Sequence, residues 1–247
     1  MKKLLFIALF ISLVSCAVRK SKLPRDVESQ FNYAMELYNQ GKYSKAIEIF
    51  KNIVFNYPTS EYVDKAQYYL AKSYKESRDY DDAILEYQFL ISTFPTSEYA
   101  EIGYIELAES YLKKSSDPRK DLKNIHLAIK YAQNFVAKYP DSPYKEKAQE
   151  VIHEAREILA ERLLYIAETY KKLGHLNSAL VYIDILLQQY PDVPAHLRAL
   201  ILKAEILFEQ GKREEAKSVV ENLSPNKIDD EKYRKKLISL RQKLNIK

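Results

Sequence analysis

Apolar residues recur along most of this chain at the i, i+3, i+4 spacing of amphipathic α-helices. Turn residues and prolines interrupt the pattern at intervals, so it predicts a series of separate helices. The last of them is expected to cap the others, because the end of a repeat array must shield its apolar face. The eleven expected helices are 27–40, 44–56, 62–77, 80–93, 99–113, 124–138, 143–173, 176–189, 194–210, 213–223 and 229–244.

The helices come in repeated pairs. An aromatic-proline dipeptide closes each of the first four pairs, and an alanine stands twelve residues before each of these prolines. A second alanine marks the first helix of each of the five pairs. The dipeptides are Tyr57-Pro58, Phe94-Pro95, Tyr139-Pro140 and Tyr190-Pro191; the alanines before them are Ala46, Ala83, Ala128 and Ala179; the first-helix alanines are Ala34, Ala71, Ala108, Ala167 and Ala204.

Two further positions recur in each unit. A turn residue stands five positions before the alanine of each second helix, which is Ala216 in the fifth unit, and is expected to end the first helix. Hydroxyl or carboxylate residues follow each proline and are expected to cap the next helix. The turn residues are Gly41, Arg78, Lys123, Gly174 and Gly211; the expected caps are Thr59-Ser60, Thr96-Ser97, Asp141-Ser142 and Asp192.

The spacing of the first-helix alanines locates two insertions. It is 37 residues everywhere except between Ala108 and Ala167, where it is 59. Eight of the 22 extra residues lie at 114–121, and fourteen lengthen the helix after Pro140. Because fourteen residues make about four helical turns, the apolar face stays in phase and the repeat continues.

Small residues, a turn, an aromatic and a proline at these offsets resemble the tetratricopeptide repeat. This resemblance implies an all-α fold of about five helix pairs, stacked as a right-handed superhelix with a concave groove, plus a C-terminal capping helix.

Composition agrees with a helical fold and removes several function classes. The chain has only 4 glycines and 1 cysteine in 247 residues, which disfavours turn-rich β-folds, glycine-loop nucleotide folds, disulfides and Cys-based zinc sites. The net charge of +5 comes from 39 basic and 34 acidic residues, so the surface is mixed and nucleic acid is not an expected partner. The repeat does not account for Gly103, which lies inside a predicted helix.

The N-terminus has the features of a lipoprotein signal. Lys2 and Lys3 precede an uncharged apolar run over 4–14 that is too short to span a bilayer. The run ends in Leu13-Val14-Ser15-Cys16, which resembles the bacterial lipobox, and this resemblance implies that Cys16 becomes the first mature residue and carries acyl chains such as palmitate. An ordinary secretory signal with a chance cysteine is the alternative.

The repeats together with the lipobox are similar to the BamD family, lipoproteins of the β-barrel assembly machinery. The similarity extends roughly over 13–223 and rests on the lipobox, the insertion with Asp117-Pro118-Arg119 and the long helix of unit four. It is clearest in YPTSEYVDKAQYYLAKSYKESRDYDDAILEYQFLISTFP and YPDSPYKEKAQEVIHEAREILAERLLYIAETYKKLGHLNSAL. The insertion is shorter than in familiar members of the family.

The BamD resemblance implies a scaffold on the periplasmic face of the outer membrane. Its expected partners are a BamA-type barrel subunit, other assembly-complex members, unfolded outer-membrane proteins and, through the lipid anchor, the membrane. The expected segments are a signal peptide at 1–15, a lipidated cysteine and basic tether at 16–25, substrate-binding repeats at 26–95, BamA-binding repeats at 96–223 and a cap at 224–247.

Residues on the first helices of units one to three suggest a peptide-binding groove. If Ala71 lies between helices, Lys65, Tyr68, Lys72 and Lys75 share one stripe. Cations beside aromatic rings suit a peptide that ends in an aromatic residue and a free carboxylate. A solvated lysine face is the alternative. The remaining candidates are Phe31, Met35, Tyr38 and Asn39 from unit one, and Glu109 and Lys113 from unit three.

The sequence lacks the motifs of an enzyme. Its four histidines have no ligand partner at metal-binding spacing, and its glycines form no phosphate or nucleophile motif. No cofactor or metal is expected. The alternative function is another repeat lipoprotein of the outer membrane, either a pilotin, which would have more regular 34-residue repeats, or a cell-envelope coordinator, which would carry a coiled coil. The basic C-terminal helix either only caps the stack or docks to a partner or an anionic surface.

Overall fold

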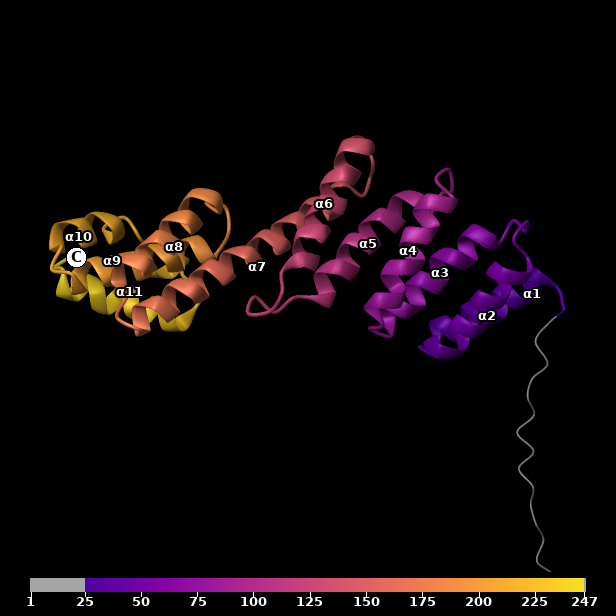
Figure 1. The fold of residues 1–247 in the computed structure, drawn as a ribbon, viewed down its shortest axis with the longest axis horizontal. Helices are drawn as coiled ribbons and strands as arrows, with labels where there is room; N and C mark the ends of the chain where they lie inside the picture. Colours follow the sequence, from indigo (N-terminus) through magenta and orange to yellow (C-terminus); the bar gives the residue numbers. More distant parts are fainter. Residues whose placement is uncertain (1–24, 247) are drawn as a thin grey trace, which may run out of the picture.

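The computed structural model describes residues 25–246, so the signal peptide, Cys16 and nearly all of the basic tether lie outside the described residues. Between residues 25 and 246 the chain forms eleven α-helices and one short 3-10 helix, with no strand. Figure 1 shows the helices following one another along a single long axis, with α1 at one end and α10 and α11 at the other. The expected all-α stack of helix pairs is confirmed.

Every predicted helix is present, and its ends differ from the predicted ends by at most three residues. The first helices of the five pairs are α1, α3, α5, α7 and α9, and the second helices are α2, α4, α6, α8 and α10. The bounds are α1 Val27–Asn39, α2 Tyr43–Asn56, α3 Val63–Glu76, α4 Tyr80–Thr93, α5 Ala100–Lys114, α6 Lys123–Lys138, α7 Lys145–Lys172, α8 Leu176–Gln189, α9 Ala195–Glu209, α10 Arg213–Val220, η1 Pro225–Lys227 and α11 Glu231–Lys243.

The largest difference is at α10, which ends at Val220 and not at the predicted residue 223. Pro225 has no amide hydrogen, and its ring would clash with the carbonyl of Glu221 if the helix continued. The Arg241 guanidinium of α11 donates to the carbonyls of Val220, Glu221 and Leu223 at 3.3, 3.1 and 2.9 Å. These bonds stabilise the backbone carbonyls at and just after the end of the helix.

The turn residues end four of the first helices in the left-handed conformation. Gly41, Gly174 and Gly211 have φ of 71°, 80° and 80°, and Arg78 has φ of 67°. At Gly41 the amide bonds to the Tyr38 carbonyl and the next amide to the Leu37 carbonyl, which is the Schellman arrangement. The prediction for Lys123 is wrong: the insertion shifts the turn, and Lys123 begins α6.

The expected helix caps are corrected in detail. Ser60, Ser97 and Ser142 accept hydrogen bonds from amides two residues ahead, at 3.1, 3.1 and 3.2 Å, so they stabilise the turn before each helix. The residues at the helix starts are the tyrosines Tyr62, Tyr99 and Tyr144, whose side chains make no capping bond. Asp192 does not cap α9 either, because it forms an ion pair with Arg156 of α7.

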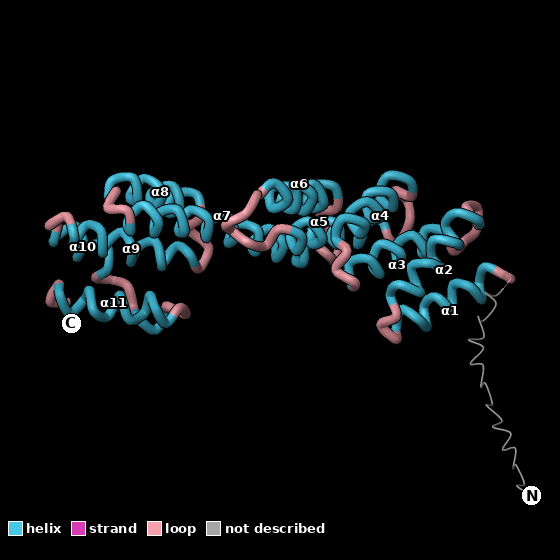
Figure 2. The backbone as a smooth tube through the Cα atoms, turned by 60° about the horizontal axis from the view of Figure 1, so that its bottom comes forward, coloured by secondary structure: helices cyan, strands magenta, loops and turns pink. Residues whose placement is uncertain are grey.

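The helices enclose two hydrophobic cores that meet on α7. The first core includes buried residues from α1 to the N-terminal half of α7, as far as Leu159. The second begins at Ala160 and includes α8 to α11. Figure 2 shows α7 joining the two halves of the molecule. The cores therefore divide the chain within unit four, whereas the predicted substrate-binding and BamA-binding segments divide at residue 95; those two assignments stay predictions.

Gly103 has a structural explanation that the repeat did not provide. It lies in the interior of α5, where an added Cβ would come within 2.9 Å of Leu90 Cδ2 and 3.3 Å of Ile91 Cγ2. Both neighbours belong to α4, and Leu90 is fully buried. A glycine at this position therefore allows α4 and α5 to approach closely.

A Gly103→Val variant should lose about 2 kcal/mol of unfolding free energy, because the new side chain overpacks the contact with Leu90. Urea unfolding followed by circular dichroism measures the loss. Ala137→Val, on the exposed surface of α6, is the control and should cost only about 0.5 kcal/mol through helix propensity. Equal losses in the two variants would contradict this account of Gly103.

Candidate functional site

Several of the predicted groove residues of units one and two lie in one aromatic cluster. Phe31 of α1 contacts Tyr62 and Tyr69, with ring centroids 5.4 and 6.1 Å apart. Tyr68 of α3 stacks on Tyr99 at 5.0 Å. Burial, followed by the nearby charge of Glu106, raises the pKa of Tyr68, so its hydroxyl stays protonated at neutral pH.

Two of the three predicted lysines lie over these rings. Lys65 Nζ is 4.9 Å from the centroid of Phe31, and Lys72 Nζ is 5.5 Å from the centroid of Tyr68. Lys72 also donates to the Tyr68 hydroxyl at 3.4 Å. Both lysines are half-buried, and within residues 25–246 neither forms an ion pair. Their charges are therefore positioned by aromatic rings and remain available to an anionic group.

The third lysine is in a different environment. Lys75 forms ion pairs with Glu106 and Glu109 of α5, and Lys147 of α7 reaches the same two carboxylates at 3.4 and 3.0 Å. Glu106 is only 4% exposed. Burial disfavours the charged form of Lys75, but the attraction of the two carboxylates outweighs it and raises the pKa of this lysine. Lys75 and Glu109 thus hold units two, three and four together.

The remaining predicted residues are more dispersed. Tyr38 joins the aromatic cluster through Tyr69, with centroids 5.5 Å apart, and Met35 lies partly buried against the first core. Asn39 is exposed at the end of α1. Lys113 is also exposed and forms an ion pair with Glu154 of α7 at 3.2 Å. The structure therefore groups Phe31, Tyr38, Lys65, Tyr68 and Lys72, which we call the lysine-aromatic cluster.

Sequence reasoning missed the tyrosines at the starts of α3 and α5. Tyr62 and Tyr99 complete the lysine-aromatic cluster by packing on Phe31 and Tyr68. A signal for them is present, because Ser-x-Tyr follows the proline at residues 60–62, 97–99 and 142–144. Glu106 was missed as well, and its position two residues before Ala108 gives no sign that it is buried.

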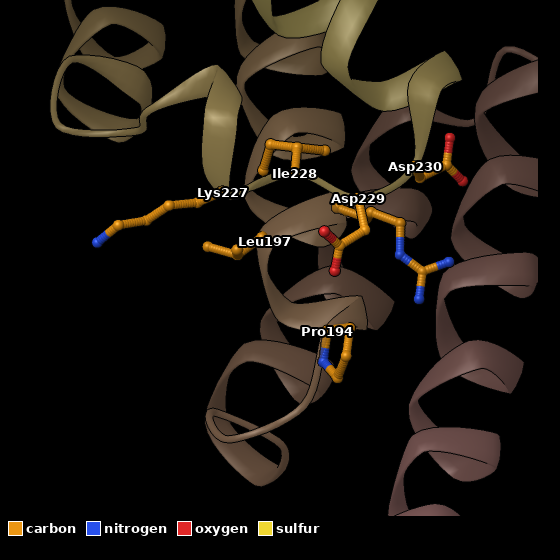
Figure 3. A pocket seen from close by; sticks show the side chains of 7 residues that line it. Pro194, Leu197, Lys227, Ile228, Asp229 and Asp230 are labelled. Carbon is orange, nitrogen blue, oxygen red and sulfur yellow. The ribbon is translucent and has the colours of Figure 1, made fainter.

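The C-terminal half has a cavity of about 290 Å³ between α9 and the connection to α11 (Figure 3). In Figure 3 the side chains of Lys227 and Asp230 extend to opposite sides of it. Arg198, which also lines the cavity, is already paired with Glu157 at 2.8 Å and with Glu161. The full lining is Pro194, Leu197, Arg198, Lys227, Ile228, Asp229 and Asp230.

The basic C-terminal helix caps the stack through specific bonds. Lys232 pairs with Glu168 of α7 at 2.8 Å, and Lys236 pairs with Glu205 of α9 at 2.9 Å. The Tyr233 hydroxyl donates to Glu168 at 2.8 Å. Most of the positive charge of α11 therefore faces its own chain.

The described residues hold no cluster of three or more potential metal ligands. A search of the same residues for a helix long and apolar enough to cross a membrane also finds none.

The fold and the repeated junctions define a helix-pair repeat protein of the tetratricopeptide type, a class of protein-interaction scaffold. The sequence profile of the YfiO family, described as an outer membrane lipoprotein, matches residues 25–223. The chain therefore belongs to this family of outer membrane lipoproteins, which is the BamD family that the sequence resembles.

Solved structures of other repeat proteins are also similar to this chain, at low sequence identity. A thermophilic TPR protein of Thermus thermophilus is 17% identical, with 88% of this chain and 100% of that chain covered and a TM-score of 0.39. A tetratricopeptide repeat protein of Parabacteroides merdae is 14% identical over 91% of this chain and 87% of that chain, with a TM-score of 0.42. A comparison with curated proteins gave no significant match.

Proposed function

We propose that this chain is the lipid-anchored scaffold of an outer-membrane β-barrel assembly complex. In this function it binds a BamA-type barrel subunit and receives unfolded outer-membrane proteins, and it catalyses no reaction. Membership of an outer membrane lipoprotein family and the repeat fold support the scaffold role. The lipobox supports anchoring through Cys16 on the periplasmic face.

The observation that supports substrate binding most directly is the lysine-aromatic cluster. Lys65 and Lys72, which form no ion pair within residues 25–246, present their ammonium groups beside the rings of Phe31 and Tyr68. A peptide ending in an aromatic residue supplies both matching groups, since its carboxylate pairs with the lysines and its ring packs on the tyrosines. Lys75 is excluded from this role because Glu106 and Glu109 already neutralise it.

Reversing Lys65 and Lys72 to glutamate should weaken binding of a barrel-protein C-terminal peptide by at least about ten-fold, since two attractive charges become repulsive. Fluorescence anisotropy with a labelled peptide measures the affinity. A peptide with an amidated C-terminus should bind the unaltered protein with a similar loss. The control reverses Lys45 and Lys130, which are exposed on α2 and α6. Unchanged affinity in the Lys65 and Lys72 variant would remove the proposed site.

Affinity isolation from detergent-solubilised envelopes tests the scaffold role. Recovery of a BamA-type barrel subunit is the expected result. Recovery of a secretin or pilus component in its place would favour the pilotin alternative and contradict the proposal. Isolation of a Cys16→Ser variant tests the anchor separately, because this variant should lack acyl chains and leave the membrane fraction.

A further inference from the structure

Beside the buried residues that begin the second core, the C-terminal half of α7 has a face that its own chain leaves largely uncovered. In a regular stack, each first helix is covered on one side by the preceding helix pair. The fourteen-residue extension of α7 changes this arrangement, because α5 and α6 pack on its N-terminal half while α8 and α9 pack on its C-terminal half. Figures 1 and 2 both show α7 crossing between the two halves. The side of its C-terminal half that points back toward unit three has no helix pair to cover it among the described residues.

The equivalent positions in the other units show whether this face is usually buried. The positions five before, two before and two after the first-helix alanine are buried or half-buried in α3, α5 and α9. In α1, where the whole array starts, they are polar and exposed or half-buried, as expected for a capping end. The residues are Ala66, Tyr69 and Ser73 in α3; Gly103, Glu106 and Ser110 in α5; Ala199, Leu202 and Ile206 in α9; and Ser29, Asn32 and Glu36 in α1.

In α7 two of the three positions carry residues like those of the internal units but are exposed, and the third is a half-buried arginine. The three positions are Arg162, Tyr165 and Thr169, and the Tyr165 side chain is 46% exposed. Thr169 donates to the carbonyl four residues earlier at 2.8 Å, as Ser73 and Ser110 do in α3 and α5, but those two serines are fully buried. The face thus keeps the small hydroxyl residue that elsewhere lies beneath a neighbouring helix.

A second apolar residue extends this face. Leu173 lies eight residues after Tyr165 and four after Thr169, so the three side chains share one side of the helix. Leu173 is 65% exposed. The stripe from Tyr165 to Leu173 is about 12 Å long, or about two helical turns. The positions equivalent to Leu173 in the other units are all polar. They are Gln40, Ser77, Lys114 and Gln210.

The charge around the stripe is positive. Arg162 lies on the stripe itself and donates to the Pro118 carbonyl of the unit-three insertion at 3.2 Å. Arg119 follows in that insertion with a side chain 67% exposed, and Lys172 is exposed at the end of α7. Asp117 and Arg119 neutralise each other in an ion pair at 3.0 Å, so the positive charges that have no acidic partner within residues 25–246 are those of Arg162 and Lys172.

We propose that the face formed by Arg162, Tyr165, Thr169 and Leu173 docks an amphipathic helix of another protein, in the place that a preceding repeat helix would occupy. The apolar stripe of that helix packs on Tyr165 and Leu173, with the small Thr169 allowing close approach. Acidic residues along its edge pair with Arg162 and Lys172. This docking face lies within the repeats at 96–223 that are predicted to bind a BamA-type subunit, so it rests on the proposed function and adds which face of α7 receives a partner helix.

Site-specific photocrosslinking in whole envelopes tests the docking face with the full, lipid-anchored chain. A benzophenone amino acid replaces Tyr165, and the matched control places it at Phe55, which is aromatic and 75% exposed on α2. The expected result is a crosslink from position 165, and not from position 55, to a helical segment of another protein that carries acidic residues, identified by mass spectrometry. An Arg162→Glu variant should reduce the crosslink yield about ten-fold, and a compensating basic residue in the partner segment should restore it.

Several results would overturn the proposal: no crosslink from position 165, a crosslink only to another copy of this chain or to residues 115–122, or a partner segment that is neither helical nor acidic. Because Tyr165 is exposed, its replacement should keep the circular dichroism spectrum and melting curve of the unaltered protein. Arg162→Glu removes the bond to the Pro118 carbonyl, so the same two measurements establish that this variant is folded before its crosslink yield is compared. Peptide affinity at the lysine-aromatic cluster and recovery of a barrel subunit are measured separately, so failure here is distinguishable from failure of the proposed function.

Discussion

Replacing Lys75 with methionine should lower the free energy of unfolding by about 3 kcal/mol, which is one of the two largest effects we expect. The substitution removes a cation from two carboxylates, one of which, Glu106, is 4% exposed. Lys147 remains, but its side chain is 37% exposed and it cannot neutralise both charges. Chemical denaturation followed by circular dichroism measures the loss.

A matched control for Lys75 exists in the second core. Lys171 of α7 occupies the equivalent position and pairs with Glu205 at 3.5 Å and with Glu209 at 2.7 Å. Glu205 keeps a second partner, Lys236, at 2.9 Å, so Lys171→Met should cost clearly less than Lys75→Met. Equal losses would show that burial of the carboxylate does not determine the effect.

The same ion pairs predict how stability depends on pH. Burial alone would raise the pKa of Glu109, but the attraction of Lys75 and Lys147 outweighs it, and the pKa is lowered from 4.5. A lowered folded-state pKa contributes stability above pH 4.5, and this contribution is lost as the pH falls through the folded-state value. The Lys75→Met variant should therefore lose less stability than the unaltered protein on acidification. An identical acid dependence of the two proteins would contradict the claim that Lys75 lowers the pKa of Glu109.

The second large effect concerns the two cores. A Phe50→Ala variant should lose about 3 to 5 kcal/mol, because Phe50 is fully buried in the first core. Since α7 is the element that both cores share, the loss should stay mostly within the first core. Amide hydrogen exchange should become faster in α1 to α6, while α8 and α9 keep their protection.

The corresponding variant in the second core is Ile183→Ala, which truncates a fully buried side chain. It should cost about 2 to 5 kcal/mol and increase exchange in α8 and α9 rather than in α1 to α6. If either variant raised exchange uniformly from α1 to α11, the chain would unfold as one cooperative unit. The proposal that the two cores lose stability separately would then be wrong.

The helix pattern was predictable from sequence because each helix carries its own local signals. The proline after Tyr57 and the glycine at 41 restrict the backbone independently of distant contacts, and the structure confirms both helix ends. Lys123 was misassigned because an eight-residue insertion changed the turn while leaving the alanine offset intact. Ser60 was misassigned because a hydroxyl after proline can stabilise either a turn or a helix start.

The candidate site was only partly predictable, because part of it depends on contacts between helices that are distant in sequence. Helical spacing placed Lys65, Tyr68 and Lys72 on one stripe of α3, which needs no information from other helices. Whether each of the three α3 lysines is free depends on the neighbouring helix, and α5 pairs Glu106 and Glu109 with Lys75 but not with Lys65 or Lys72. Charge pairing across 31 and 34 residues has no local sequence signal.

The sequence by itself therefore determined the helices, their pairing into repeats and the family, because backbone restrictions and apolar periodicity act over a few residues. The tertiary structure alone decided where one core ends and the next begins, which lysines keep an unpaired charge and which face of α7 is left open. These properties depend on which helices lie against each other, and the fourteen-residue extension of α7 changed that arrangement while leaving the periodicity intact.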